Sequence, residues 1–83
     1  MKRSGPRRVS SDELIALILY YAKCDSPDEA SAILEEARAG NAAAQYITGM
    51  ALAQAGEESS EWMEKSAAQG FKPALIKLGK LSA

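Results

Sequence analysis

Small residues recur at one fixed spacing along this 83-residue chain. The offset is 30 positions, and it relates four pairs: Ala37 and Ala67, Gly40 and Gly70, Ala44 and Ala74, and Gly49 and Gly79. Such self-similarity is typical of repeated supersecondary units. An alanine or glycine on a packed face lets a neighbouring helix come close, which offsets the cost of about 1 kcal/mol that a glycine carries inside a helix. We therefore predict a repeated helical hairpin with these small residues at its close contacts.

Capping and stop signals divide the chain into five predicted helices, which cover about residues 10–23, 27–39, 42–55, 58–69 and 72–81. Ser10 and Glu13 have the spacing of a capping box at the start of the first helix. Ser26 and Glu29 repeat this spacing at the start of the second helix, and Asn41 is predicted to cap the third.

Glycines predict where several helices end. Gly40, Gly56 and Gly70 each follow a predicted helix, where glycine takes a positive φ without strain. No segment alternates over the length of a strand, and links of one to four residues favour antiparallel neighbours. We predict an all-α fold, a short α-solenoid of antiparallel helix pairs with about five helices in two and a half hairpins. A flexible basic arm at residues 1–9 precedes a single helical-repeat domain at residues 10–83.

Charge is distributed unevenly, although the net charge is only −1. Residues 1–8 carry four positive charges, residues 25–64 have a net charge of −8, and residues 65–83 have a net charge of +4. A basic arm suits nucleic acid, an anionic membrane or an acidic protein surface. The acidic middle would repel phosphate, so we interpret the arm as a solubilising tail and keep a nucleic-acid-associated regulator as the alternative.

The cellular setting is indicated by one cysteine and one apolar run. Cys24 alone cannot form an intramolecular disulfide, which favours a reducing, cytoplasmic location. The apolar run at residues 14–22 has nine residues, whereas a helix that spans a bilayer needs about 20. Acidic residues precede the run and KCDSPDE follows it, which does not fit a secretory signal. We interpret the run as a buried helix and expect no membrane association.

Residue patterns of catalytic and metal sites are missing from the sequence. It has no histidine, the usual proton shuttle near neutral pH, and no glycine-rich phosphate loop after a strand. The charge of Asp25 would raise the pKa of the adjacent Cys24 thiol. Neighbouring acids such as Glu35 and Glu36 diverge by about 100° on a helix, so they do not converge on one ion. We expect no catalytic residue, no metal, no cofactor and no enzymatic activity.

The segment WMEKSAAQGFKPALIKLG, which starts at Trp62, is similar to the Sel-one-like repeat, a short relative of the tetratricopeptide repeat. The residues that stand at the spacing of that family are Trp62, Lys65, Ala67, Gly70, Ala74, Leu78 and Gly79. Ser66 departs from the pattern, and the 30-residue unit is shorter than the family's usual one. The resemblance implies a right-handed stack of antiparallel helix pairs that acts as an adaptor or scaffold for other proteins, commonly in bacterial signalling or secretion.

A binding face follows from the repeat. Tyr46 and Met50 are expected to point away from the paired helix, and the 30-residue offset relates Met50 to Tyr20. The same offset relates Tyr46 to Ile76. Aromatic residues and methionine are enriched in the cores of interfaces, so these four residues are candidates for an apolar partner-binding stripe. The alternative is that some of them pack between helices, as we expect for Trp62.

The sequence therefore predicts a small non-enzymatic module that docks on one protein, as an adaptor, inhibitor or regulator of a bacterial or phage protein in the cytoplasm. The last predicted helix, at residues 72–81, has two interpretations. It is either a half-polar cap on the stack or an open side that receives a partner or a second copy in a homodimer.

Overall fold

The computed structural model describes residues 9–81. Within this range the chain forms five helices and no strand: α1 (Ser11–Ala22), α2 (Pro27–Ala39), α3 (Ala42–Gln54), α4 (Ser60–Ala68) and α5 (Lys72–Lys77). The predicted all-α fold with about five helices is confirmed. The predicted basic arm lies outside the described residues except for Val9, which packs against the core.

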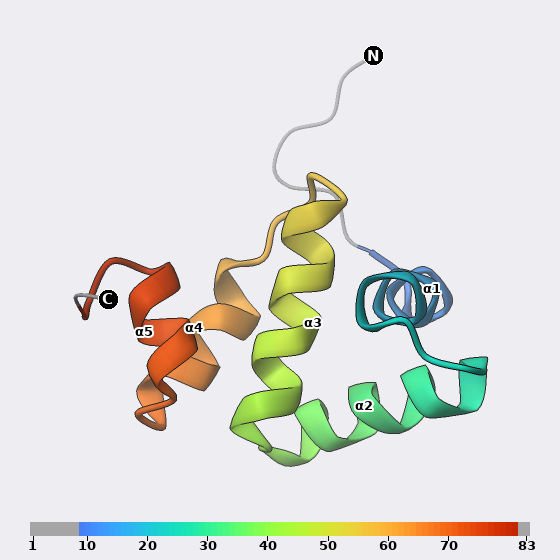
Figure 1. Cartoon of the computed structure of the whole chain (residues 1–83), viewed down its shortest axis with the longest axis horizontal. Helices are drawn as coiled ribbons and strands as arrows, with labels where there is room; N and C mark the ends of the chain where they lie inside the picture. The colour runs from blue at the N-terminus through green and yellow to red at the C-terminus, as the bar shows by residue number, and fades with distance from the viewer. Residues whose placement is uncertain (1–8, 82–83) are drawn as a thin grey trace.

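The α3 helix is at the centre of the molecule (Figure 1). It contacts α1, α2 and α4, whereas α5 packs chiefly against α4. In Figure 1, α4 descends beside α3 and α5 returns beside α4, so these neighbours run in opposite directions. The α1 helix is seen nearly along its axis while α2 crosses below it, so the first pair crosses steeply.

Two of the predicted helix starts have the expected side-chain caps. The Ser10 Oγ accepts a hydrogen bond from the Glu13 N–H at 3.2 Å, and Glu13 accepts one from the Ser10 N–H at 3.3 Å. At α3 the Asn41 Oδ1 accepts from the Ala44 N–H at 2.9 Å. These bonds satisfy N–H groups that have no partner within the helix.

The second predicted capping box is wrong. Ser26 is the N-cap of α2, but its side chain makes no capping hydrogen bond. The Glu29 carboxylate instead accepts a hydrogen bond from the Asp25 N–H at 3.0 Å, one residue before the N-cap. The carboxylate thus stabilises the turn between α1 and α2.

All five helices end in the same way. After each helix, one residue takes a positive φ, and the next N–H donates to a carbonyl five residues back, at 2.8 to 3.4 Å. The residues with positive φ are Lys23, Gly40, Gly56, Gly70 and Gly79. This is the hydrogen-bond pattern of a Schellman motif, which satisfies carbonyls at the end of a helix. The predicted stops at Gly40, Gly56 and Gly70 are therefore confirmed.

The predicted length of the last helix is wrong. We expected a helix over 72–81 with Gly79 in its interior, but α5 ends at Lys77. Gly79 has a φ of +76° and an exposed surface, and the Lys80 N–H donates to the Leu75 carbonyl at 2.8 Å. Gly79 thus terminates the helix and does not line a close helix contact.

The core has two clusters. The first cluster lies between α1, α2 and α3 and consists of Leu14, Ile18, Ala30, Leu34, Ala51 and Leu52. The second cluster joins α4 to α5 and consists of Met63, Ala67 and Ala74. Trp62 of α4 is half-buried and packs against the first cluster. Since Tyr46 and Met50 of α3 pack against the second cluster, α3 contributes to both.

The predicted close contact at Gly49 is confirmed. Gly49 is buried in the middle of α3, and a Cβ atom there would lie 2.8 Å from the Met63 Cε and 3.5 Å from the Met63 backbone nitrogen. The small size of Gly49 therefore lets α4 approach α3. The four alanines of the repeat, Ala37, Ala44, Ala67 and Ala74, are also buried.

Polar side chains connect α4 to the turn between α2 and α3. The Ser66 hydroxyl donates to the Ala42 carbonyl at 2.8 Å. The Gln69 amide donates to the Gln45 Oε1 at 2.9 Å and to the Gly40 carbonyl at 2.8 Å. No buried side-chain nitrogen or oxygen of residues 9–81 lacks a hydrogen-bond partner. These bonds hold α4 in one position along α3.

Candidate functional site

Tyr46 and Met50, two of the four residues of the predicted stripe, are half-buried between helices. The Tyr46 ring centroid lies 5.6 Å from that of Phe71, with the planes tilted by 50°. Met50 packs against the second cluster. Such tilted ring pairs are favourable contacts, so both residues hold α3 against the α4–α5 pair.

Tyr20 and Ile76, the other two, are exposed. Tyr20 at the end of α1 has 76% of its surface accessible, and Ile76 of α5 has 42%. Figure 1 places α3 between these two helices. Because α3 separates the helices that carry Tyr20 and Ile76, and Tyr46 and Met50 are half-buried, the four predicted residues do not form one continuous stripe.

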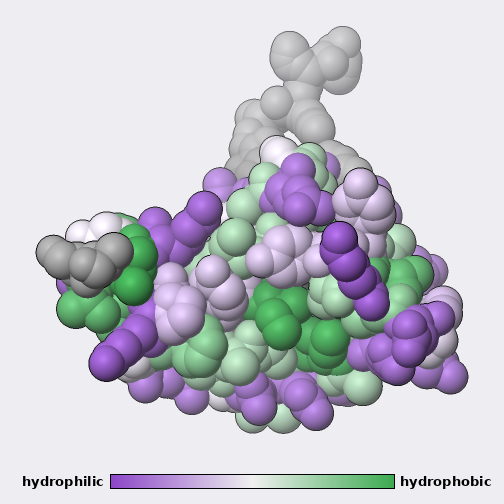
Figure 2. All heavy atoms as spheres, viewed as in Figure 1, coloured by the Kyte–Doolittle hydropathy of each residue, from purple (hydrophilic) through white to green (hydrophobic). Residues whose placement is uncertain are grey.

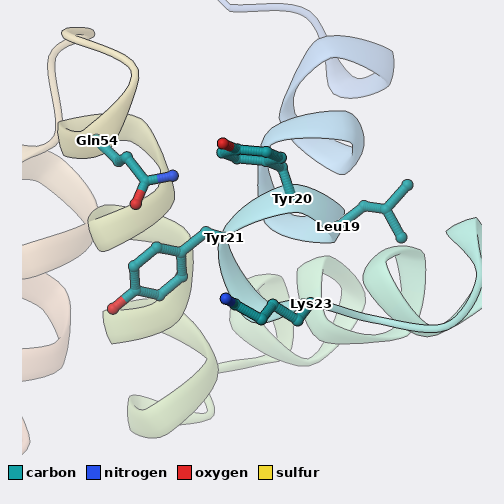
Figure 3. A pocket seen from close by; sticks show the side chains of 5 residues that line it. All are labelled: Leu19, Tyr20, Tyr21, Lys23 and Gln54. Carbon is teal, nitrogen blue, oxygen red and sulfur yellow. The ribbon is translucent and has the colours of Figure 1, made fainter.

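A depression between the C-terminal ends of α1 and α3 contains one of the predicted residues. It is lined by Leu19, Tyr20, Tyr21, Lys23 and Gln54 (Figure 3). In Figure 3 the two tyrosine rings and the Gln54 amide surround the same open space, Lys23 lies along its lower side, and the Leu19 side chain points away. We call these five residues the tyrosine depression.

The tyrosine depression combines apolar surface with hydrogen-bonding groups. The tyrosine hydroxyls and the Gln54 amide can each donate and accept, and the Lys23 ammonium can only donate. Figure 2 shows an apolar area near the depression, where α1, α2 and α3 meet, with hydrophilic residues around it. Tyrosine gives a large rigid contact area with one polar end, which suits a surface that binds protein.

Lys23 has an unusual backbone conformation within the tyrosine depression. Its φ of 56° and ψ of 47° are left-handed, and it is the only non-glycine residue with a positive φ among residues 9–81. This conformation costs a residue with a Cβ roughly 1–2 kcal/mol. A lysine at this position keeps a charged side chain beside Tyr20 and Tyr21 that a glycine would not supply.

The Cys24 thiol next to the depression is not activated. Partial burial raises its pKa, and the carboxylates of Glu29 and Asp25 raise it further. The sequence predicted the effect of Asp25, whereas the larger effect of burial comes from the packing of Cys24 against the first cluster. A thiol in this environment stays protonated near neutral pH and is a weak nucleophile.

Neither a metal cluster nor a helix able to cross a membrane is found in the described part of the chain. Within residues 9–81, no three cysteine, aspartate or glutamate side chains are grouped so that they could hold an ion. The helices of the same range are too short, or not apolar enough, to cross a bilayer.

Tyr20 is the one predicted site residue that lines the tyrosine depression, and its other four residues were not among those predicted. Tyr21 directly follows Tyr20, so two adjacent tyrosines near the end of a predicted helix could have indicated that both contribute to one surface. The sequence gave no indication that Lys23 would take a positive φ, because this conformation favours glycine and is taken by a glycine after each of the other four helices. Gln54 belongs to a helix distant in sequence, so only the packing of α1 on α3 brings it to Tyr20.

Comparisons of the chain with protein-family models, curated proteins and solved structures gave no match. The similarity to the Sel-one-like repeat therefore depends on the residue spacing between Trp62 and Gly79.

Proposed function

We propose that the chain is a non-enzymatic protein–protein interaction module, a small cytoplasmic adaptor, inhibitor or regulator that docks on one partner protein through the tyrosine depression. The observation that carries this proposal is the exposure of Tyr20, which has 76% of its surface accessible beside Tyr21 and Lys23. Large aromatic side chains with a polar end are enriched among the residues that contribute most to protein binding.

The proposed surface replaces part of the stripe predicted from the sequence. Tyr46 and Met50 support the second cluster, so their substitution would disturb the fold as well as any contact. Tyr20 is so exposed that its truncation removes little packing within the chain. Loss of binding in a Tyr20 variant would therefore report on the surface itself.

The test is affinity capture of a partner with the full chain, followed by mass spectrometry. We expect the wild-type chain to recover one protein in a stoichiometric amount and Tyr20→Ala to reduce that recovery at least tenfold, as is typical of a central interface residue. Tyr20→Phe should retain part of the binding, because it keeps the ring and loses only the hydroxyl.

Glu35→Ala is the control, because it truncates a long exposed side chain on α2 outside the tyrosine depression, and it should leave the recovery of the partner unchanged. Both alanine variants should keep wild-type helicity by circular dichroism. If Tyr20→Ala recovers the same partner with unchanged yield, the tyrosine depression is not the docking surface.

A further inference from the structure

The charges of the described chain are separated between its two ends. Residues 9–71 contain eleven acidic and three basic residues, whereas residues 72–81 contain three lysines and no acid. In Figure 1, α5 lies at one edge of the molecule, the connection between α1 and α2 lies at the opposite edge, and α3 lies between them. The edge formed by α4, α5 and the residues up to 81 has four lysines (Lys65, Lys72, Lys77 and Lys80) and two acids (Glu61 and Glu64). The opposite edge, at residues 23–29, has three acids (Asp25, Asp28 and Glu29) and one lysine (Lys23). The first edge is therefore a basic end and the opposite edge an acidic end.

The basic end combines charge with exposed apolar residues. It consists of Lys72, Ile76, Lys77 and Leu81. Ile76 and Leu81 have 42% and 40% of their surfaces accessible. Neither Lys72 nor Lys77 forms an ion pair within the described residues, whereas the neighbouring Lys80 lies 3.4 Å from Glu64. Since α5 packs chiefly on α4, its outer side has no helix over it.

The acidic end is the turn that leads into α2. It consists of Asp25, Asp28 and Glu29, which are all exposed. The Glu29 carboxylate accepts a hydrogen bond from the Asp25 N–H, which fixes part of this surface. The Asp25 and Asp28 side chains form no ion pair with any of residues 9–81, so their charges are available to a second molecule.

We propose that the chain associates with itself head to tail, with the basic end of one copy on the acidic end of the next. Charge complementarity favours this arrangement over a two-fold dimer. A two-fold contact through α5 would place Lys72 and Lys77 against the same lysines of the other copy, which is repulsive. Because the two ends lie at opposite edges, each added copy leaves a free end for another.

This inference goes beyond the docking of a foreign partner, and it uses a different surface. Tyr20 belongs to neither end. A failure of self-association would therefore leave the capture experiment unaffected, and a failure of capture would leave the self-association experiment unaffected.

Sedimentation velocity of the full chain across a dilution series is the first test. At low salt we expect the average mass to increase with concentration to values above that of a dimer. High salt should return the chain to the monomer, because it screens interactions between exposed charges. A monomer at every concentration in low salt would overturn the proposal.

Complementation between variants tests the head-to-tail geometry. Lys72→Gln combined with Lys77→Gln neutralises the basic end, and Asp25→Asn combined with Asp28→Asn neutralises the acidic end. Each double variant should be monomeric alone, with helicity unchanged by circular dichroism. An equimolar mixture should form a one-to-one dimer and nothing larger, because only one pair of intact ends remains.

The alternative geometry gives the opposite result. A two-fold dimer through α5 would persist in the Asp25→Asn and Asp28→Asn variant on its own. Association of either double variant alone would therefore overturn the head-to-tail proposal.

Discussion

At the scale of one residue, Lys23 combines an unfavourable left-handed backbone conformation with a side chain that lines the tyrosine depression. The other four helices end at a glycine with positive φ, but α1 ends at a lysine with φ of 56°. The backbone hydrogen bond from the Cys24 N–H to the Leu19 carbonyl, at 3.1 Å, holds this conformation. The Lys23 side chain in return lines the tyrosine depression.

We predict that Lys23→Gly stabilises the fold by about 0.5–1 kcal/mol. Relief of the left-handed strain should outweigh the greater freedom that glycine has in the unfolded chain. Urea unfolding followed by circular dichroism measures the change. Gly40→Ala is the matched control at the end of α2, where φ is +110°, and it should destabilise by about 1 kcal/mol. A destabilised Lys23→Gly would show that side-chain contacts of Lys23 outweigh its backbone strain.

At the scale of the helices, two contacts position α4. Gly49 allows the Met63 side chain to lie against the α3 backbone, and Ser66 and Gln69 donate hydrogen bonds to carbonyls at and before the start of α3. The first contact depends on the absence of a side chain at Gly49, and the second on the polar side chains of Ser66 and Gln69. Of these, Ser66 stands where the Sel-one-like pattern has alanine. Together they determine how close α4 lies to α3 and where along it.

Gly49→Leu should destabilise the fold by more than about 2 kcal/mol, because atoms beyond the Cβ would meet the Met63 backbone. Gly49→Ala should be nearly neutral, since a gain in helix propensity of about 1 kcal/mol offsets the displacement of the flexible Met63 methyl group. Ala43→Leu, at an exposed position of α3, is the control and should have little effect. Equal stabilities of the two leucine variants in thermal unfolding would contradict the close contact.

Ser66→Ala should cost about 1 kcal/mol, although it restores the residue that the Sel-one-like pattern has at this position. The hydroxyl is fully buried and donates to the Ala42 carbonyl at 2.8 Å, so its removal loses a hydrogen bond between helices. Urea unfolding of the full chain checks the change. A stabilised variant would mean that packing of an alanine here outweighs this bond.

At the scale of the whole molecule, α3 joins the two clusters of the core. It supplies Ala51 and Leu52 to the first cluster, and Tyr46 and Met50 pack against the second. If α3 unfolded, both clusters would lose the side-chain contacts that α3 makes with them. The described chain is therefore expected to unfold as one unit despite its two clusters.

We predict that Trp62 fluorescence and circular dichroism report the same unfolding midpoint in urea. Leu34→Ala, at a fully buried position of the first cluster, should destabilise by about 2–5 kcal/mol and shift both signals together. Two separate transitions, with only one shifted by Leu34→Ala, would show that the clusters unfold independently.

Local interactions explain why much of the fold was predictable. The Ser10 and Asn41 caps and the stops at Gly40 and Gly70 involve atoms a few residues apart, so residue type and spacing are enough to predict them. The same rule also applied to Gly79, but its place in the repeat suggested a helix interior instead. The 30-residue offset also predicted that the four alanines of the repeat are buried. Their spacing along the chain determines which face of its helix each one occupies.

Residue spacing left open which large side chains remain exposed. Tyr20 and Met50 are related by the same offset, yet Tyr20 is mostly accessible and Met50 packs in the core. The difference arises because α1 crosses its neighbours steeply, while α3 lies between other helices. Contacts between distant segments decide such angles, and they also bring Gln54 to Tyr20 and place the two charged ends at opposite edges.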